Sequence, residues 1–329
     1  NAVIKMAGND RIFYIERSAP DSSDVNDQPI DVALNEVTLQ GCDAATCADQ
    51  GGLIYNKERL KIQYSQLLGG KAREGGAVYN AGIYVANKSL SFVSIANSIM
   101  QNNIAEQGAV IYSEILQYDI SRSVIRDNSA KGAGAALFYA RDAYTEEVVK
   151  ALASYTGGIS NSTIFNNSGY VIRVMDGMII NNITMILNKM GLIVDAPFKK
   201  AVVANSVLAK NGTEDCKIMA GGSPELLTNN LYSIGCEGTQ SQALGTANLI
   251  ASSTSEGQCD IASDGILCPF KLYDGVALGY FRPRLLATYK NLSDSLIVNK
   301  GPALQSIIRK CNADDQRGLK RPAQDELCD

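Results

Sequence analysis

The chain has 329 residues, of which 46% are hydrophobic and 19% are charged, so it can fold as a globular protein with a sizeable core. Its net charge of −4 provides no basic field for nucleic acid or an anionic membrane. It contains no histidine, which excludes Ser-His-Asp and Cys-His catalysis and histidine-ligated metals; it also lacks tryptophan, although its 15 tyrosines retain some capacity for stacking.

The chain begins NAVIKMAGND, which has neither the charged region nor the apolar region of an export signal. If the protein is exported, we expect its signal peptide to have been removed. No run of about 18 apolar residues occurs anywhere, so we expect no transmembrane segment.

The eight cysteines are even in number and absent from residues 48–215, and none has the C-x-x-C spacing of a zinc or redox site. We favour disulfides, and hence an oxidising compartment, over eight buried thiols in a cytosolic protein. Sequential pairing is the simplest connectivity, although the sequence leaves it open: Cys42–Cys47, Cys216–Cys236, Cys259–Cys268 and Cys311–Cys328.

Residues 97–103, NSIMQNN, begin a series of similar segments. The series continues at 122–128, 161–167, 182–188, 205–211 and 230–236, so successive starts lie 25, 39, 21, 23 and 25 residues apart. This period indicates a stacked-repeat fold, and the missing L-x-x-L-x-L frame favours a β-helix over leucine-rich repeats. Each period holds three short β-rich segments. We therefore predict an all-β fold, a right-handed, three-faced parallel β-helix.

Recurring asparagines fit the corners of such a coil, because asparagine tolerates the left-handed conformation and stacked amides form hydrogen-bonded ladders. The first predicted row comprises Asn97, Asn161, Asn182, Asn205 and Asn230. The second comprises Asn103, Asn128, Asn167, Asn188 and Asn211. Several asparagines of the repeated segments also begin N-x-S/T sequons, which we interpret mainly as ladder positions: Asn161, Asn166, Asn182 and Asn211.

Residues 141–156 account for the 39-residue step and have apolar residues at helical spacing, with Thr145 suited to a helix start. We predict a short helical excursion there, which covers hydrophobic surface or serves as a binding element. After about residue 237 the repeat fades. The predicted organisation is therefore a β-helix with an N-terminal cap over residues 1–240, followed by irregular C-terminal coils and a cap over 241–329, with both ends stapled by disulfides.

A candidate site follows from aligning GYVIR at 169–173 with GLIVD at 191–195. The alignment places Arg173 beside Asp195, with Asp176 nearby and Lys217 one coil further along. Polysaccharide lyases use an arginine or lysine base, and glycosidases use paired carboxylates, so either chemistry could proceed without histidine. We favour the alternative, an exposed ion-pair ladder worth less than about 1 kcal/mol per pair, because the acids form no dense cluster.

We predict no cofactor. Calcium is the weaker alternative, because four loop aspartates lack the D-x-D-x-D frame: Asp43, Asp49, Asp260 and Asp264. Aspartate in turns commonly serves the turn itself.

The segments GGAVYN, LSFVSIANSIMQNN, GAVIY and SVIRDNSAKGAGAALF, within about residues 50–240, resemble the pectate-lyase-like β-helix repeats of bacterial surface proteins. They are similar to the polymorphic outer-membrane-protein type and to CSLREA-domain, choice-of-anchor proteins. The tail at 285–329, with its DQRG, RP and late Cys-Asp, resembles the C-terminal signature of the choice-of-anchor group. The resemblance implies a secreted or cell-surface location and no particular reaction. We interpret Asp315, Arg317 and Arg321 as a salt-bridged cap on the last coil.

We therefore expect an exported bacterial β-helix protein that is a non-catalytic binding, adhesion or structural module, with a glycan or a protein at a cell surface as its partner. The alternative is a polysaccharide-depolymerising lyase or glycoside hydrolase that uses Arg173, Asp176 and Asp195. A purely mechanical spacer is the third possibility.

Overall fold

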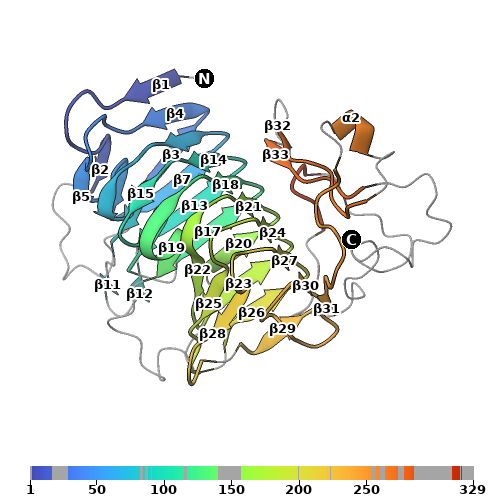
Figure 1. Cartoon of the computed structure of the whole chain (residues 1–329). Helices are drawn as coiled ribbons and strands as arrows, with labels where there is room; N and C mark the ends of the chain where they lie inside the picture. Colours follow the sequence, from blue (N-terminus) through green and yellow to red (C-terminus); the bar gives the residue numbers. More distant parts are fainter. Residues whose placement is uncertain are drawn as a thin grey trace.

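The computed structural model describes residues 2–16, 29–81, 84–85, 88–89, 91–114, 117–139, 157–198, 200–222, 224–252, 256–259, 264–272, 278–284, 313–318 and 320. These residues form an all-β parallel β-helix, as the repeat predicts, with three long sheets wound around one core (Figure 1). The predicted helical excursion at 141–156 lies outside the described residues, and the predicted boundary near residue 240 remains a prediction.

Each coil passes in turn through three sheets, named A, B and C here. Sheet A consists, in spatial order, of β1 (Ala2–Lys5), β4 (Val37–Gln40), β8 (Gln66–Leu68), β14 (Ile99–Gln101), β18 (Val124–Arg126), β21 (Thr163–Phe165), β24 (Thr184–Ile186), β27 (Val207–Ala209), β30 (Leu231–Tyr232) and β31 (Gln242–Ala243). Sheet B consists of β2 (Phe13–Ile15), β6 (Ile54–Asn56), β10 (Val78–Asn80), β16 (Ile111–Ser113), β19 (Ser129–Tyr139), β22 (Ser168–Val174), β25 (Leu192–Val194) and β28 (Cys216–Ile218), with β15 (Ile104–Ala105) beside β19.

Sheet C consists of β3 (Asp31–Asn35), β7 (Arg59–Gln63), β13 (Phe92–Ala96), β17 (Tyr118–Ser121), β20 (Gly157–Ser160), β23 (Met178–Asn181), β26 (Val202–Ala204) and β29 (Leu226–Thr228). The smaller described elements are the parallel pair β5 (Ala48–Gln50) and β9 (Ala72–Glu74), the antiparallel pairs β11 (Tyr84–Val85) with β12 (Lys88–Ser89) and β32 (Lys271–Leu272) with β33 (Gly279–Tyr280), and the short helix α2 (Glu256–Cys259).

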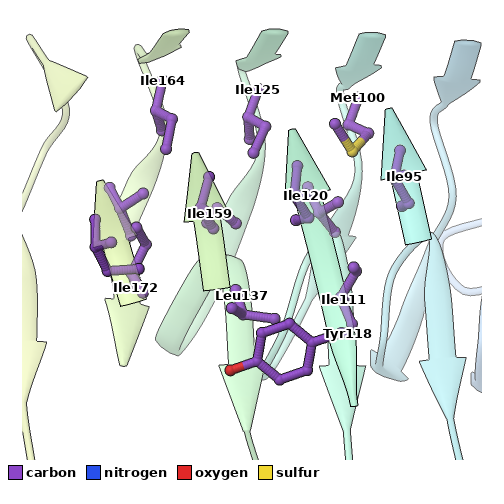
Figure 2. Packing of buried hydrophobic residues seen from close by; sticks show 14 of the residues in the cluster. Ile95, Met100, Ile111, Tyr118, Ile120, Ile125, Leu137, Ile159, Ile164 and Ile172 are labelled. Carbon is purple, nitrogen blue, oxygen red and sulfur yellow. The ribbon is translucent and has the colours of Figure 1, made fainter. Parts of the chain in front are cut away.

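The core forms because alternate residues of each short strand point inward and repeat in register from coil to coil. In sheet C, for example, Ile95 pairs with Ile120, and Ile120 pairs with Ile159. These three isoleucines are at most 1% exposed. Figure 2 shows how isoleucine, leucine and methionine side chains from successive coils fill the interior. The largest fully buried side chain, that of Tyr118, lies among them.

The second predicted asparagine row is a continuous hydrogen-bonded ladder along the rod. Each side-chain amide donates to the carboxamide oxygen of the next asparagine at 2.8–3.0 Å, in the order Asn103, Asn128, Asn167, Asn188 and Asn211. Asn211 then donates to Asp215 at 3.0 Å, so a carboxylate ends the ladder. All five asparagines are buried, which is possible because their polar atoms are paired.

The first predicted row forms the corner between sheets C and A. Its members have positive φ angles of 45–54° at Asn97, Asn161, Asn182 and Asn205. Each backbone N–H donates to a carbonyl of the next coil, as Asn97 does to Ser121 at 3.2 Å. The left-handed backbone conformation that these four positions share explains their asparagines.

The assignment of Asn230 to that first row was wrong by one residue. Asn229 has the positive φ, 53°, and Asn230 lies opposite Ser206, because Leu231 pairs with Val207. Ser206 belongs to a separate row, in which the backbone N–H of one residue donates to the side chain of its neighbour in the next coil. The N–H of Ser206, for example, donates to Asn230 Oδ1 at 3.1 Å. Because Asn229 and Asn230 are adjacent, the sequence does not show which of them continues the row of Asn97.

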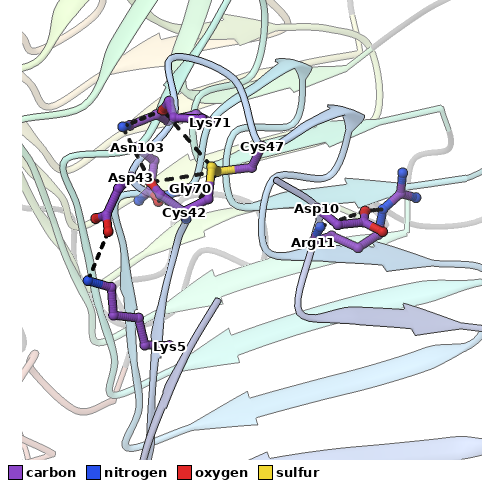
Figure 3. Close-up of a disulfide and its surroundings, with 10 residues drawn as sticks. Lys5, Asp10, Arg11, Cys42, Asp43, Cys47, Gly70, Lys71 and Asn103 are labelled. Carbon is purple, nitrogen blue, oxygen red and sulfur yellow. Dashed lines mark hydrogen bonds and ion pairs between the residues drawn. A yellow bond between two sulfur atoms is a disulfide. The ribbon is translucent and has the colours of Figure 1, made fainter. Parts of the chain in front are cut away.

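Three of the four sequential cysteine pairs are disulfides in the structure: Cys42–Cys47, Cys216–Cys236 and Cys259–Cys268. Cys311 and Cys328 lie outside the described residues. Figure 3 shows the Cys42–Cys47 bridge close to Gly70, whose N–H donates to Asn103, the first residue of the buried ladder, at 2.9 Å. This disulfide and the one at Cys216 therefore lie near the beginning and the end of the ladder.

The segment around Asp315 does not cap the last coil, contrary to the prediction. Asp314 pairs with Arg122 at 3.3 Å, and Gln316 accepts a hydrogen bond from Thr163 at 2.6 Å, so the segment lies against coils in the middle of the rod. Asp315 and Arg317 are joined by an ion pair, Oδ2 to Nε at 2.7 Å, which braces their own turn. Arg321 lies outside the described residues.

The segment around Asp315 lies beside the rod because sheet A has an apolar outer face. Phe165 and Ile186 lie on this face and pack with Leu249, Phe270 and Phe281 from the region that follows the coils. Figure 1 shows β32, β33 and α2 alongside the rod. Burial of this hydrophobic cluster holds the C-terminal region on the side of the helix.

Candidate binding face on the outside of sheet B

The outward positions of sheet B carry a stack of four tyrosines: Tyr14, Tyr55, Tyr79 and Tyr112. They are stacked because the strands pair in register, so equivalent outward residues repeat from coil to coil. Successive ring centroids lie 4.8, 5.1 and 5.2 Å apart, and the planes are within 14° of parallel. Offset stacking of this kind adds to the stability gained by burial alone.

Charged groups surround the first two rings. The guanidinium of Arg11 lies 5.3 Å from the ring centroid of Tyr55, and the ammonium of Lys57 lies 5.6 Å from that of Tyr14. Lys57 also pairs with Glu16 at 2.6 Å, and this hydrogen bond lowers the pKa of Glu16 and raises that of Lys57. Both groups therefore remain charged at neutral pH.

The middle of the stack is covered. Tyr79 is only 2% exposed, and its hydroxyl donates to Glu114. Burial and then this hydrogen bond raise the pKa of Tyr79, and burial raises that of Tyr55. These phenols are consequently neutral hydrogen-bond donors, and Tyr14, Tyr55 and Tyr112 supply the accessible part of the stack.

Further along sheet B the outward row becomes charged, and here the structure brings Arg173 and Asp195 together. Arg173 is paired in register with Ile193, and its guanidinium donates to Asp195 Oδ2 from Nη2 at 2.6 Å and from Nε at 3.2 Å. The two side chains are 27% and 26% exposed. The pair is thus a partly exposed ion pair on the outer face.

Lys217 lies one coil further along, as predicted, but it is opposite Ile193 and not Asp195. Its ammonium lies 3.2 Å from the hydroxyl of Tyr170, which in turn donates to Glu214 at 2.9 Å. The hydrogen bond with Tyr170 raises the pKa of Lys217. Arg173, Asp195, Lys217, Tyr170 and Glu214 together form the charged half of the face, in which acids and bases neutralise one another.

Asp176 does not join this group. Its side chain is fully buried between β22 and β23, where Oδ1 accepts the N–H of Lys200 at 2.8 Å and Oδ2 accepts that of Phe198 at 3.2 Å. A carboxylate held in this way organises a turn and cannot reach a polysaccharide on the surface. Arg173 and Lys217 therefore lie in one row through Ile193, and Asp195 joins them from a position two residues beyond Ile193.

Replacing Asp176 by alanine is expected to lower the free energy of unfolding by about 2–3 kcal/mol, because two buried N–H groups lose their acceptor. The matched change Asp195→Ala removes a partly exposed ion pair and is expected to cost less than about 1 kcal/mol. Urea denaturation of both variants measures the difference. Equal effects would contradict the assignment of Asp176 to a structural role.

The described aspartates that were candidate calcium ligands each bind a different group of the chain. Asp43 pairs with Lys5 at 3.2 Å, Asp49 pairs with Arg73 at 2.9 Å, and Asp264 accepts hydrogen bonds from Ser252 and Asn248. Asp260 lies outside the described residues. Within the described part of the chain, no group of three or more histidine, cysteine, aspartate or glutamate side chains is placed to hold a metal ion.

The tyrosine stack was not anticipated from the sequence. Its signal was present in the repeated triplets IYN at 54–56, VYN at 78–80 and IYS at 111–113. Tyr170 and Glu214 had no comparable signal, since they come together only when the coils stack.

Comparison with known proteins adds no assignment: no family model, curated protein or solved structure matches the chain. In the part of the chain that the structure describes, no helix is long and apolar enough to cross a membrane.

Proposed function

We propose that this chain is an exported bacterial β-helix protein, secreted or at the cell surface, that acts as a non-catalytic binding, adhesion or structural module. The contact surface is the outer face of sheet B, with its tyrosine stack and its charged half. The partner is a glycan or a protein at a cell surface.

The observation that carries the proposal is that each candidate reactive group is already bound to another group of the chain. Arg173 is paired with Asp195, Lys217 contacts Tyr170, and Asp176 is buried and bound to backbone N–H groups. A general base needs access to the proton that it removes, and a glycosidase needs two carboxyl groups facing the same bond. Paired ions and stacked rings on a regular face suit recognition better.

Export is supported by the three disulfides, since such bonds persist mainly in oxidising environments. The bacterial surface location rests on the resemblance of the repeats and of the tail to pectate-lyase-like and choice-of-anchor proteins. The contact surface on sheet B is proposed from the contacts of its residues and is independent of that resemblance.

A glycan-array screen of the purified chain, followed by mass spectrometry of any products released from the bound polysaccharides, tests the proposal. Binding without cleavage is the expected result. Cleavage would favour the lyase or glycosidase alternative, and Arg173→Ala and Asp195→Ala would then identify the reactive groups. Absence of binding to glycans and to surface proteins would leave the mechanical spacer as the better account.

A further inference from the structure

The charged half of sheet B carries balanced charges. Arg173 pairs with Asp195, and both side chains are partly exposed. Lys217 and Glu214 contact the hydroxyl of Tyr170 at 3.2 and 2.9 Å. The two cations and the two carboxylates of this group sum to zero, so the group provides no net field that would attract a polyanion.

The contacts of Tyr170 bridge two coils of the rod. The N–H of Val171 donates to Gly191 at 2.9 Å, and the N–H of Gly191 donates to Glu214 at 3.2 Å, so Glu214 lies two coils beyond Tyr170. The side chains of Tyr170 and Glu214 therefore meet over the coil of β25, which lies between those of β22 and β28 (Figure 1). Tyr170 is itself partly exposed, which places an aromatic ring beside the charged groups.

The charged half retains hydrogen-bonding capacity that its internal contacts do not use. Both bonds from Arg173 end on Oδ2 of Asp195, and the bond from Tyr170 ends on Oε1 of Glu214. Within the described part of the chain, Oδ1 of Asp195 and Oε2 of Glu214 accept no hydrogen bond. The ammonium of Lys217 has three N–H groups and meets one hydroxyl. Two carboxylate oxygens and one ammonium are thus available to a ligand.

Sugar hydroxyls match this set of donors and acceptors. A hydroxyl group both donates and accepts, so neighbouring hydroxyls of one sugar can donate to a carboxylate and accept from an ammonium. An aromatic ring provides contact for the apolar C–H face of the same sugar. A uronic acid would bring a further carboxylate close to Asp195 and Glu214, and like charges placed together oppose binding.

We propose that the charged half binds an uncharged polysaccharide, with one sugar ring against Tyr170 and its hydroxyls bonded to the two carboxylates and the ammonium. This inference rests on the proposed function, because it names the class of glycan for the same face. Strands of successive coils repeat at about 4.8 Å, which is close to the length of one sugar in an extended chain. The polysaccharide therefore lies along the rod, and the coils of β22, β25 and β28 contact successive sugars.

Calorimetric titration of the full chain tests the class of ligand. The probes are oligosaccharides of cellulose, xylan, mannan and galactan, any other uncharged glycan retained on the array, and oligogalacturonate as the acidic probe. At least one uncharged glycan should bind, and its dissociation constant should change less than about twofold between about 0.05 and 0.5 M sodium chloride.

Three outcomes would overturn the inference while the proposed binding function stands. They are tightest binding of oligogalacturonate, an affinity for the uncharged glycan that falls about tenfold over the same range of salt, and binding of surface proteins alone. Cleavage of the bound glycan would instead contradict the proposed function itself, so the two failures are distinguishable.

Conservative carboxylate variants test the residues without disturbing the fold. Glu214→Gln keeps an acceptor for Tyr170 but removes the charge that strengthens a hydrogen bond from a sugar hydroxyl. It should raise the dissociation constant of the uncharged glycan about five- to tenfold. Asp195→Asn together with Glu214→Gln leaves both cations uncompensated, so oligogalacturonate should then bind in a salt-dependent manner.

The matched control lies on sheet C. Asp31 is an exposed aspartate that pairs with Arg59 at 3.8 Å, as Asp195 pairs with Arg173. Asp31→Asn should leave the dissociation constant within about twofold. Equal effects of Glu214→Gln and Asp31→Asn, or a double variant that still rejects oligogalacturonate, would contradict recognition through the charged half.

Discussion

Replacing Tyr118 by alanine should lower the free energy of unfolding by about 4 kcal/mol, because the side chain fills the core and the coils around it can collapse only partly. Tyr118 is 0% exposed and is paired with Gly157 in the next coil. A Cβ atom built at Gly157 would lie 3.0 Å from Cζ of the Tyr118 ring, so the glycine makes room for the ring. Figure 2 shows the ring near Ile111 and Leu137.

Chemical denaturation measures this loss, provided that the denaturant dependence of the free energy of unfolding is the same in the variant and the wild type. The control is Tyr118→Phe, which keeps the ring and should cost less than about 1.5 kcal/mol, since it removes only the hydroxyl. If Tyr118→Phe and Tyr118→Ala were equally destabilising, the hydroxyl rather than the packed ring would be the important group, and the packing explanation would be wrong.

The second large effect is expected in the asparagine ladder. Asn167 stands in its middle, where its oxygen accepts the N–H of Asn128 at 2.9 Å and its amide donates to Asn188 at 2.9 Å. Replacement by alanine leaves buried polar groups of the adjacent coils unpaired and should cost about 3 kcal/mol or more. Hydrogen exchange should show the loss in the coils on both sides.

The neighbouring asparagine provides the control. Asn166 is exposed and has a φ of 55°, so Asn166→Gly preserves the left-handed turn and should change stability by less than about 1 kcal/mol. Because both variants alter adjacent asparagines of one corner, equal losses would contradict a special contribution of the buried amide of Asn167 to stability.

The fold was predictable because its signal is repeated along the chain. The asparagines of the second row occupy the same position in every coil. A continuous ladder requires this, because each coil must supply a side chain that both donates and accepts a hydrogen bond. The first row was harder to assign. Its residues satisfy a backbone angle, which Arg122 also adopts with a φ of 48°, so residue type marks the position less strictly.

Contacts between distant parts of the chain were not predictable. The bond between Thr163 and Gln316 joins residues 153 positions apart, and no periodicity in the sequence indicates it. The tyrosine stack also has no regular spacing in the sequence: Tyr55 and Tyr79 are 24 residues apart, but Tyr79 and Tyr112 are 33 apart. An insertion between the coils breaks the spacing while leaving the register of sheet B intact.

The candidate site was predicted in part. The alignment of two strand ends was wrong by two residues, because Arg173 lies opposite Ile193 and not opposite Asp195. Arg173 and Asp195 nevertheless form the predicted pair, since positions two residues apart share a face of the sheet and the long arginine side chain reaches Asp195 just beyond β25. The alignment could not show that Asp176 turns inward, since that depends on the loop in which Phe198 and Lys200 lie.

The measurement that tests the account most directly is lysine acetylation of the chain with and without the ligand that binds best in the screen. Lys217 is exposed on the outer face of sheet B, whereas Lys61 is exposed on sheet C. Binding through the proposed face predicts that the ligand protects Lys217, leaves Lys61 reactive and is recovered uncleaved. Protection of Lys61 with Lys217 still reactive, or recovery of a shortened ligand, would contradict it.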